Sequence, residues 1–193
     1  MLEVRGLTKS FDGFVAVSRV SFDVAKGSVC AIIGPNGAGK TTLFNLITGH
    51  LRCDAAFLSH RGRGWNLFTP VRDLYRDETL RLLDSLGLAD RAGEIAGFLS
   101  HGAQKQLELG LALALEPDIL LLDEPTAGMS AGETRETIRL VDRIARERGL
   151  TLLFTEHDME VVFSIAQKIT VLHQGRVIAD GSPADVRADA EVR

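Results

Sequence analysis

The sequence predicts an α/β fold with a mostly parallel core sheet, and three observations support it. Segments with the period of strands alternate with segments with the period of helices along most of the chain. Two runs, at residues 28–33 and 118–123, are almost continuously apolar, as strands buried inside a parallel sheet are. The first run leads directly into a glycine-rich loop and a helix, which is the order of a phosphate-binding unit. The length of 193 residues favours a single domain covering residues 1–193.

Each element is predicted from a local signal. Strands are predicted near residues 2–8, 20–25, 28–33, 118–123, 151–155, 169–173 and 176–179. Helices are predicted near residues 40–50, 72–87, 100–115, 131–148 and 158–166. Gly149 marks the end of the longest helix, just before the strand that begins at Thr151.

Composition narrows the class of protein. The chain is 45% hydrophobic and 25% charged, which is ordinary for a soluble globular protein. No run approaches the roughly 18 apolar residues of a membrane-spanning helix, and the first residues show no secretory signal. The net charge of −4 disfavours a nucleic-acid surface, and the arginines from Arg61 to Arg81 alternate with acidic residues. Cys30 and Cys53 lack metal-ligand spacing and fit a reducing cytoplasm.

The glycine-rich loop has the spacing of a phosphate-binding loop. Residues 34–41 fit the pattern G-x-x-x-x-G-K-[ST] between a strand and a helix. Glycines let backbone N–H groups turn around phosphate, and the helix N-terminus adds partial positive charge. Lys40 would reach the β- and γ-phosphates of a nucleotide, and the Thr41 hydroxyl would bind Mg²⁺. The alternative, a turn before an ordinary helix, is disfavoured by the strand–loop–helix context.

Two acids end the second apolar run. Asp123 and Glu124 follow a predicted buried strand, and open α/β sheets bind ligands at the carboxyl ends of such strands. Asp123 would hold Mg²⁺, and Glu124 would polarise an attacking water. A strand that simply ends in acids at a surface turn is the alternative, and the presence of Lys40 makes it the weaker interpretation.

A capped helix follows Leu99. Ser100 is a strong helix-capping residue, and Leu107, Leu111 and Leu115 fall on one face at steps of four. Ser100-His-Gly-Ala-Gln resembles the signature motif of ATP-binding cassette (ABC) proteins, usually Ser-Gly-Gly-Gln after a leucine. His101 and Ala103 depart from that form as amino-acid and amide importers do. The resemblance implies that Ser100 and Gly102 contact the γ-phosphate of an ATP held by a partner subunit.

A histidine stands between a predicted strand and a helix start in Leu152–Met159. A lone histidine is more often structural or solvated, but catalytic residues gather at such loop positions. The resemblance places His157 where the ABC switch histidine contacts the γ-phosphate and the catalytic glutamate. The stretches Leu7–Val17 and Glu156–Pro183 further resemble the ATPase subunits of branched-chain amino-acid importers and their urea or amide relatives.

The resemblance implies a P-loop NTPase fold of the ABC ATPase type, with an antiparallel N-terminal edge and a helical signature subdomain. It implies ATP and Mg²⁺ as cofactors. Phe11 is expected to stack on adenine, with Phe14 in reserve, and a buried core phenylalanine is an equally weighted alternative. The remaining nucleotide-binding residues in the loop are expected to be Gly34, Pro35, Asn36, Gly37, Ala38, Gly39, Lys40, Thr41 and Thr42.

Roles and partners follow from the same resemblance. Glu124, His157 and Lys40 would be catalytic, and Thr41 and Asp123 would bind the metal. The expected partners are a second ABC ATPase subunit, identical or homologous, and transmembrane permease subunits. A periplasmic or extracellular solute-binding protein would act indirectly, and no nucleic acid is expected. The chain would lie in the cytoplasm, on the inner face of the membrane, as part of an importer for branched-chain amino acids or related amides.

The middle of the chain departs from the family. Only 60 residues separate Lys40 from Ser100, no glutamine occurs between Thr41 and Leu99, and the turn at residues 51–56 passes into a segment that resembles sequence beyond the family's glutamine loop. Some forty to fifty residues are therefore expected to be absent from a shortened region, about 52–98. Omitted residues, a real deletion, or a substitute formed around Asn66 are the open explanations.

Two smaller departures accompany the shortened middle. Ser130 stands where most relatives have an aspartate that helps to join the two sites, and the chain ends at Arg193, before a short helix that relatives usually carry. With the absent glutamine, these features motivate an alternative function. The chain would then bind ATP but hydrolyse it poorly, as an uncoupled nucleotide-binding subunit.

Overall fold

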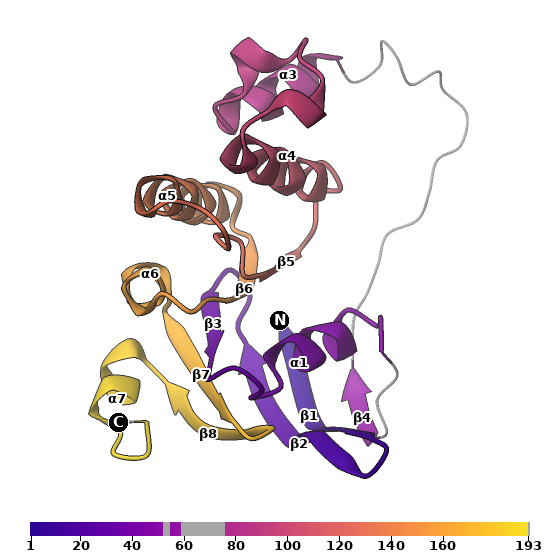
Figure 1. Cartoon of the computed structure of the whole chain (residues 1–193), viewed down its shortest axis with the longest axis vertical. Helices are drawn as coiled ribbons and strands as arrows, with labels where there is room; N and C mark the ends of the chain where they lie inside the picture. Colours follow the sequence, from indigo (N-terminus) through magenta and orange to yellow (C-terminus); the bar gives the residue numbers. More distant parts are fainter. Residues whose placement is uncertain (52–54, 59–75, 193) are drawn as a thin grey trace. The chain divides into compact units, whose positions relative to one another are not determined.

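The computed structural model describes residues 1–51, 55–58 and 76–192 of the chain. The chain forms two compact units (Figure 1). The first unit comprises Met1–His60, Ile119–Pro125 and Ala145–Arg193. The second comprises Arg61–Asp118 and Thr126–Ile144.

The first unit contains a three-stranded antiparallel sheet. Its strands, in the order β2-β1-β4, are β1 (Leu2–Phe11), β2 (Phe14–Val24) and β4 (Ala55–Leu58). Asp12 and Gly13 join β1 to β2, and both have positive φ values, 46° and 89°, as a two-residue hairpin turn requires. The antiparallel N-terminal edge implied by the family resemblance is confirmed.

Two boundaries of this sheet differ from the sequence prediction. β2 begins at Phe14 rather than near residue 20, because residues 14–17 pair with the last residues of β1. The predicted turn at residues 51–56 is wrong in its second half, since Ala55 already belongs to β4 and pairs with Thr8 of β1. Both strands are held by cross-strand pairing with β1, a contact that local periodicity does not reveal.

A five-stranded, mostly parallel sheet also lies in the first unit, as predicted. Its order is β5-β6-β3-β7-β8, and only β8 runs antiparallel, beside β7. Its strands are β3 (Val29–Ile33), β5 (Ile119–Asp123), β6 (Thr151–Thr155), β7 (Lys168–His173) and β8 (Arg176–Gly181). The helices of the unit are α1 (Lys40–Ile47), α6 (Met159–Ile165) and α7 (Pro183–Ala188).

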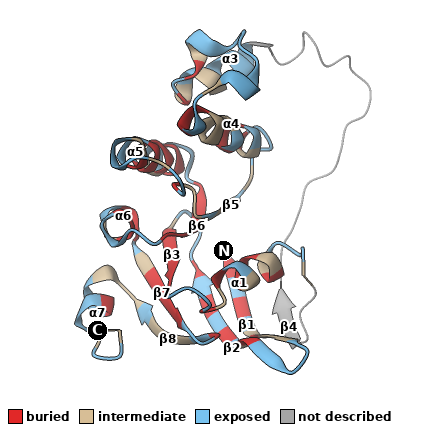
Figure 2. Ribbon diagram, in the orientation of Figure 1, coloured by how far each residue is buried: buried red, intermediate tan, exposed pale blue. Residues whose placement is uncertain are grey.

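Burial in this sheet follows strand position. Every residue of β3 and β6 is buried, whereas in β5 only Leu120 is, because β5 forms the edge of the sheet (Figure 2). The predicted strand at 118–123 is thus confirmed as parallel but is not fully buried. The main apolar cluster of the unit draws on β1, β2, β3, α1 and single residues of other strands. It consists of Leu2, Val4, Leu7, Val17, Val20, Phe22, Val24, Cys30, Ile32, Ala38, Leu43, Phe44, Leu46, Leu153 and Leu172.

A charged side chain ties three strands of the first unit together. Lys168 Nζ, at the start of β7, lies 2.9 Å from an Asp180 carboxylate oxygen and 3.5 Å from one of Asp23. Burial by itself lowers the pKa of Lys168, but the hydrogen bond and charge of Asp180, with the charge of Asp23, raise it above its ordinary value. The ammonium therefore stays charged where β2, β7 and β8 meet.

The second unit is helical in its described part. It contains α3 (Arg76–Ser85), two short 3₁₀ turns at Ala89–Arg91 and Ala96–Phe98, α4 (His101–Leu113) and most of α5 (Ala131–Arg148). The predicted helix at 131–148 is confirmed at both ends, and Gly149 ends it with a φ of 61°. Leu86 packs directly against Gly110 of α4. A Cβ at position 110 would lie 2.5 Å from Leu86 Cδ1, so the contact requires glycine.

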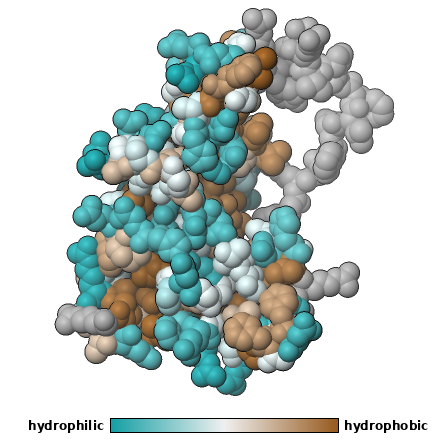
Figure 3. Space-filling view, in the orientation of Figure 1, coloured by the Kyte–Doolittle hydropathy of each residue, from teal (hydrophilic) through white to brown (hydrophobic). Residues whose placement is uncertain are grey.

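The predicted apolar face of α4 is wrong. Leu111 and Leu115 are 66% and 82% exposed, and Leu115 lies beyond the end of the helix. The buried face instead carries small residues among its leucines, and one of them, Gly110, lies where a Cβ would meet Leu86. Its members are Gly102, Ala103, Leu109, Gly110 and Leu113. Figure 3 shows hydrophobic side chains among hydrophilic ones on the visible face of the molecule.

Several predictions concern residues outside the described ranges. Cys53, Asn66 and three arginines of the interleaved cluster (Arg61, Arg63 and Arg72) lie there, as do the first residues of the helix predicted at 72–87. Its described part runs from Arg76 to Ser85. In the described part of the chain, no helix has both the length and the apolar character to cross a membrane.

Candidate functional site

The predicted phosphate-binding loop, residues 34–41, follows β3 in the first unit and has a backbone that requires glycine at two positions. Gly34 and Gly39 have φ values of 154° and 97°. A Cβ on Gly34 would overlap the carbonyl oxygen of Leu172, and a Cβ on Gly39 would lie 2.5 Å from the carbonyl oxygen of Ala16. At positions 34 and 39 the loop therefore adopts a conformation that only glycine fits.

Lys40 begins α1 and is buried beneath this loop. Its side chain is only 6% exposed, and Nζ donates hydrogen bonds to the carbonyl oxygens of Gly34 at 2.8 Å and Pro35 at 3.2 Å. Gly39, the N-cap of α1, is left-handed and offers no side-chain acceptor to the first turn. The backbone N–H groups in the first turn of α1 therefore have no side-chain acceptor, and the Lys40 ammonium lies beside the loop. Together these donors suit a phosphate group.

Gly175 supports the loop from another hairpin, and the sequence analysis did not identify it. Gly175 lies in the turn between β7 and β8 with a φ of 75°. Its N–H donates to the Ala38 carbonyl at 3.0 Å, and its own carbonyl accepts from the Ser18 N–H at 2.8 Å. A Cβ there would lie 2.6 Å from the Ala16 carbonyl oxygen. A Gln-Gly pair between two predicted strands was the available signal for this turn.

Asp123, the last residue of β5, and Glu124, which follows it, are both hydrogen-bonded to Thr155 of β6. Asp123 and Thr155 are paired in the parallel register of the two strands, and Thr155 Oγ1 donates to Asp123 Oδ1 at 2.6 Å. The Glu124 N–H donates to the same hydroxyl at 3.0 Å and to the Thr155 carbonyl at 3.2 Å. Thr155 was not among the predicted site residues, because no local motif marks it.

Glu124 and His157 lie together, as the resemblance implies. His157 Nε2 is 2.6 Å from Glu124 Oε1, and both side chains are partly exposed, 46% and 36%. Glu124 has a positive φ of 49°, which is uncommon for a residue with a Cβ. Asp158 caps α6 directly after the histidine by accepting from the Glu160 N–H at 2.9 Å. The backbone that follows His157 is therefore held.

The donor set suits a small, hard cation. Thr41 and Asp123 both have exposed side chains, in the first turn of α1 and at the end of β5, and these two elements are in contact. Mg²⁺ is usually bound by one or two carboxylates together with substrate phosphates, which matches a hydroxyl and a carboxylate beside a phosphate loop. Among the described residues, no group of three or more His, Cys, Asp or Glu side chains is placed to hold a metal.

A cavity of about 390 Å³ lies against the start of the loop. Gly34, Pro35, His157, Met159 and His173 are among the residues that line it. Free volume is therefore present where the loop and His157 approach each other, within the first unit.

Phe11 is 41% exposed, so the alternative interpretation of a buried core residue is wrong. Lys9 Nζ lies 5.3 Å from the centroid of its ring, and Phe11 pairs with Phe14 across the hairpin. Phe14 is 68% exposed. Both rings are accessible for stacking, and which of them would meet an adenine stays a prediction.

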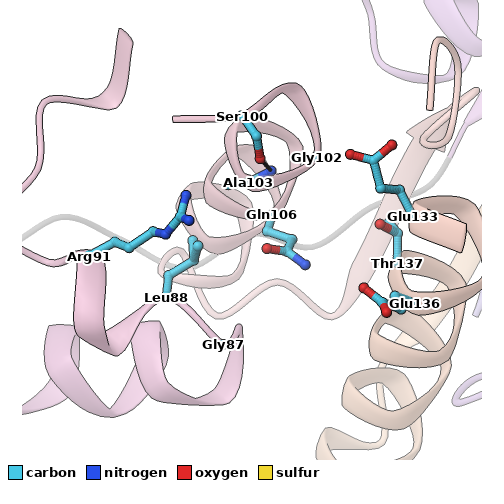
Figure 4. Close-up of a pocket in the computed structure, with 10 residues that line it drawn as sticks. All are labelled: Gly87, Leu88, Arg91, Ser100, Gly102, Ala103, Gln106, Glu133, Glu136 and Thr137. Atoms are coloured by element: carbon cyan, nitrogen blue, oxygen red, sulfur yellow. Dashed lines mark hydrogen bonds between the residues drawn. The ribbon is translucent and has the colours of Figure 1, made fainter. Parts of the chain in front are cut away.

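The predicted signature residues belong to the second unit. Ser100 is the N-cap of α4, and its hydroxyl accepts a hydrogen bond from the Ala103 N–H at 3.3 Å. Gly102 is buried. Both residues line a cavity of about 360 Å³ between α4 and α5, in which the side chains of Arg91, Gln106 and Glu133 also take part (Figure 4).

Ser130, which replaces the family's aspartate, has a clear local role in the second unit. Its hydroxyl donates to Glu133 Oε2 at 2.7 Å, and its N–H donates to the same oxygen at 2.9 Å. These hydrogen bonds, from the side chain first and then the backbone, lower the pKa of Glu133 below its ordinary value of 4.5, with a smaller contribution from His101. Ser130 and Glu133 thus form a reciprocal cap at the start of α5.

The chain matches the family model described as "ABC transporter" in two overlapping segments, residues 17–73 and 65–127. It is 32% identical over 243 residues to the high-affinity branched-chain amino acid transport ATP-binding protein BraF of Pseudomonas aeruginosa, covering 100% of this chain and 95% of that protein. It is 30% identical over 243 residues, with the same coverage, to the corresponding protein LivG of Escherichia coli.

Solved structures show the same fold. The ADP conformation of MJ1267, an ATP-binding cassette of an ABC transporter, superposes with a TM-score of 0.88 at 26% identity, covering 100% of this chain and 96% of that one. The structure of cbiO1 from Clostridium perfringens, part of the ABC transporter complex cbiONQ, superposes with a TM-score of 0.87 at 26% identity, covering 100% and 92%.

Proposed function

The chain belongs to the ABC transporter family, and from this premise we propose that it is the Mg²⁺-dependent ATPase subunit of an importer. The observation that carries the proposal is the pair formed by Glu124 and His157, which lie 2.6 Å apart, in the same unit as Asp123 and the loop residues that would bind nucleotide. A carboxylate at the end of a sheet strand, with a histidine to orient it, can take a proton from an attacking water.

The phosphate-binding loop would hold ATP chiefly through charge and backbone donors. Lys40 Nζ now donates to two carbonyl oxygens of the loop, which keeps the ammonium beside the loop. On binding ATP it would donate to phosphate oxygens instead. Thr41 and Asp123 would hold Mg²⁺, which supplies positive charge to the transferred phosphoryl group. Phosphoryl transfer asks little covalent chemistry of the protein, so positioning and electrostatics account for most of the catalysis.

Glu124 would orient and deprotonate the water. Its backbone is held by Thr155 and its side chain by His157, so the carboxylate has a defined direction before a nucleotide binds. His157 would keep the carboxylate in place and, as the resemblance implies, contact the γ-phosphate. The two residues act as a unit, and loss of either should affect turnover more than binding.

The proposed assembly is a dimer of ABC subunits on permease subunits. Ser100 and Gly102 lie at the N-terminus of α4, a position that suits an anion supplied by a second subunit. Permease subunits would place the chain at the inner face of the membrane, and an external solute-binding protein would act through them. Homodimers and heterodimers are both compatible with these residues.

Branched-chain amino acids are the proposed solutes. The support is that BraF and LivG, which are 30–32% identical to this chain over its whole length, are branched-chain amino acid transport ATP-binding proteins. The test is uptake of labelled leucine and urea by the source cells when the chain carries Glu124→Gln. Loss of leucine uptake with unchanged urea uptake is expected. Loss of urea uptake with unchanged leucine uptake would contradict branched-chain amino acids as the solutes and favour urea.

We also propose that the region of about 52–98 is shortened relative to the family. The alignment to BraF spans 243 positions whereas this chain has 193 residues, and the family model matches in two pieces that meet near residues 65–73. With no glutamine between Thr41 and Leu99, the family's glutamine contact to Mg²⁺ is unavailable. This favours a second candidate function, a subunit that binds ATP and hydrolyses it poorly.

Turnover and affinity measured on one preparation separate the two functions. The wild-type chain should bind MgATP and release phosphate, Lys40→Ala should lose binding, and Glu124→Gln should keep binding but lose about 10²- to 10⁴-fold of turnover. Tight binding by the wild type with turnover no higher than that of Glu124→Gln would establish the binding-only function. Wild-type turnover by Glu124→Gln would remove Glu124 as the base.

A further inference from the structure

We propose that Thr155 is a positioning residue for both carboxylates of the site. The inference rests on the proposed function and deepens it, since it assigns to one buried hydroxyl the orientation of Asp123 and of Glu124. Thr155 belongs neither to the glycine-rich loop nor to the segment of Asp123 and Glu124. It lies 31 residues beyond Glu124 in the chain.

The geometry allows the Thr155 hydroxyl one arrangement of hydrogen bonds. Thr155 is fully buried, and a hydroxyl has a single proton to donate. That proton goes to Asp123 Oδ1 at 2.6 Å, so the oxygen itself faces the Glu124 N–H, 3.0 Å away. The parallel register of β5 and β6 sets Thr155 directly opposite Asp123. One side chain is therefore hydrogen-bonded to both acids at once.

The hydroxyl bond fixes which oxygen of Asp123 is free. Asp123 is exposed, so without a partner its carboxylate could rotate. With Oδ1 accepting from Thr155, Oδ2 is the oxygen left for a cation. Partners of metal-binding groups orient the ligand, and their loss typically lowers metal affinity or activity by about 10- to 100-fold.

The second bond holds the unusual backbone of Glu124. The residue has a φ of 49°, and its N–H is shared between the Thr155 carbonyl at 3.2 Å and the Thr155 hydroxyl at 3.0 Å. Left-handed backbone persists at functional sites only where its surroundings impose it. The same backbone turns the Glu124 carboxylate to within 2.6 Å of His157. The hydroxyl thus contributes to the direction of the catalytic side chain.

The test compares a variant that lacks the hydroxyl with one that keeps it. Thr155→Val has nearly the same shape and no hydroxyl, whereas Thr155→Ser retains the hydroxyl. Thr151→Val is the matched control, because Thr151 is also fully buried, begins the same strand and accepts a hydrogen bond from Gly27 at the far end. For each protein, kcat, the Mg²⁺ concentration for half-maximal turnover, and ATP affinity with and without Mg²⁺ are measured.

Thr155→Val should lower kcat about 10- to 100-fold and raise the Mg²⁺ requirement several-fold, with ATP affinity in the absence of Mg²⁺ unchanged. Thr155→Ser and Thr151→Val should stay within about twofold of the wild type. Wild-type values for Thr155→Val, equal losses in Thr155→Ser, or equal losses in Thr151→Val would each overturn the inference.

The measurements of ATP affinity with and without Mg²⁺ test the role of Thr155 separately from the proposed ATPase function. A wild-type chain without turnover contradicts the proposed ATPase. The gain in ATP affinity on adding Mg²⁺ still decides the role of Thr155, because that gain depends on Asp123 and not on hydrolysis. A gain retained in full by Thr155→Val would overturn the positioning of Asp123 by Thr155.

Discussion

At the scale of single residues, Asp123 and Glu124 stand side by side at the end of β5 but have different partners. Asp123 accepts from the hydroxyl of Thr155, whereas the Glu124 carboxylate lies against His157. A hydroxyl leaves an acid free to bind a cation through its other oxygen, and a histidine can share a proton with an acid. Adjacent carboxylates therefore suit different roles because of what each one contacts.

His157→Ala should reduce ATP turnover by about 10²- to 10⁴-fold, the range typical of acid–base groups. The reason is that Glu124 loses the side chain that holds its carboxylate 2.6 Å away. Affinity for MgATP should change by less than threefold, and steady-state phosphate release with nucleotide titration measures both. His173→Ala is the control, because His173 lines the same cavity as His157. Equal losses in both variants would argue against a special role for His157.

Gly34→Ala should abolish nucleotide binding and destabilise the first unit by more than Gly13→Ala. Both glycines have positive φ values, so both variants incur backbone strain of roughly 1–3 kcal/mol. Only Gly34 has a backbone carbonyl, that of Leu172, in the space that the new Cβ would occupy, whereas Gly13 has nothing within 4 Å. Urea unfolding and a fluorescent-nucleotide titration measure the two effects. A Gly34→Ala chain that binds nucleotide normally would contradict the close approach.

At the scale of elements, the start of α5 explains why serine serves at position 130. The hydroxyl and N–H of Ser130 both bind the Glu133 carboxylate, and the Ser130 carbonyl accepts from the Thr134 N–H at 2.9 Å. An aspartate at this position could also cap the helix, since serine and aspartate are similarly good N-caps. The local requirement is therefore for a cap, and the helix does not itself demand an aspartate.

Ser130→Ala should lower the free energy of unfolding by about 1 kcal/mol. Ser130→Asp can still cap the helix, but its carboxylate cannot donate to Glu133 Oε2 and repels it, so this variant should also be less stable than the wild type. The cost for Ser130→Ala should depend on pH. Because the pKa of Glu133 is lowered in the folded chain, its stabilising contribution is complete above the unfolded pKa of 4.5 and is lost as pH falls through the folded pKa. The difference between wild type and Ser130→Ala should thus be largest near neutral pH and shrink in acid.

Urea unfolding between neutral pH and pH 3 measures that difference. Glu133→Gln is the control, because glutamine can replace glutamate in a capping box but does not titrate. A gap between wild type and Ser130→Ala that is constant with pH would show that Glu133 is not the linked group.

At the scale of the whole molecule, each of the two compact units carries part of the predicted site. The phosphate-binding loop, both acids and His157 belong to the first unit, and Ser100 and Gly102 belong to the second. Under the proposed function, each ATP is held by the first unit of one subunit and the second unit of its partner. A site of this kind is incomplete in one chain, so nucleotide should promote association.

Glu124→Gln with ATP should therefore form a dimer, with a mass near twice the 20.9 kDa of the chain. The reason is that ATP that is not hydrolysed keeps the subunits joined. Light scattering after gel filtration gives the mass with and without ATP. Lys40→Ala should remain a monomer under the same conditions because it does not bind the nucleotide. A Glu124→Gln chain that stays monomeric at saturating ATP would contradict the two-subunit site.

The sequence by itself determined the local parts of this protein. The phosphate-binding loop, the ends of α5 and the caps at Ser100 and Gly149 follow from residue type and short-range spacing, because their hydrogen bonds join residues a few positions apart. The mostly parallel sheet followed from the alternation of strand and helix signals. The family followed from several motifs in one order along the chain.

Only the tertiary structure decided the contacts between distant segments. Thr155 meets Asp123 because β5 and β6 pair in one particular register, and Gly175 meets Ala38 because a hairpin reaches the loop. The buried face of α4 includes Gly110 because Leu86 packs there, a contact that the spacing of the helix's leucines did not indicate. Such contacts depend on which elements become neighbours, and residue spacing within one element carries no information about its neighbours.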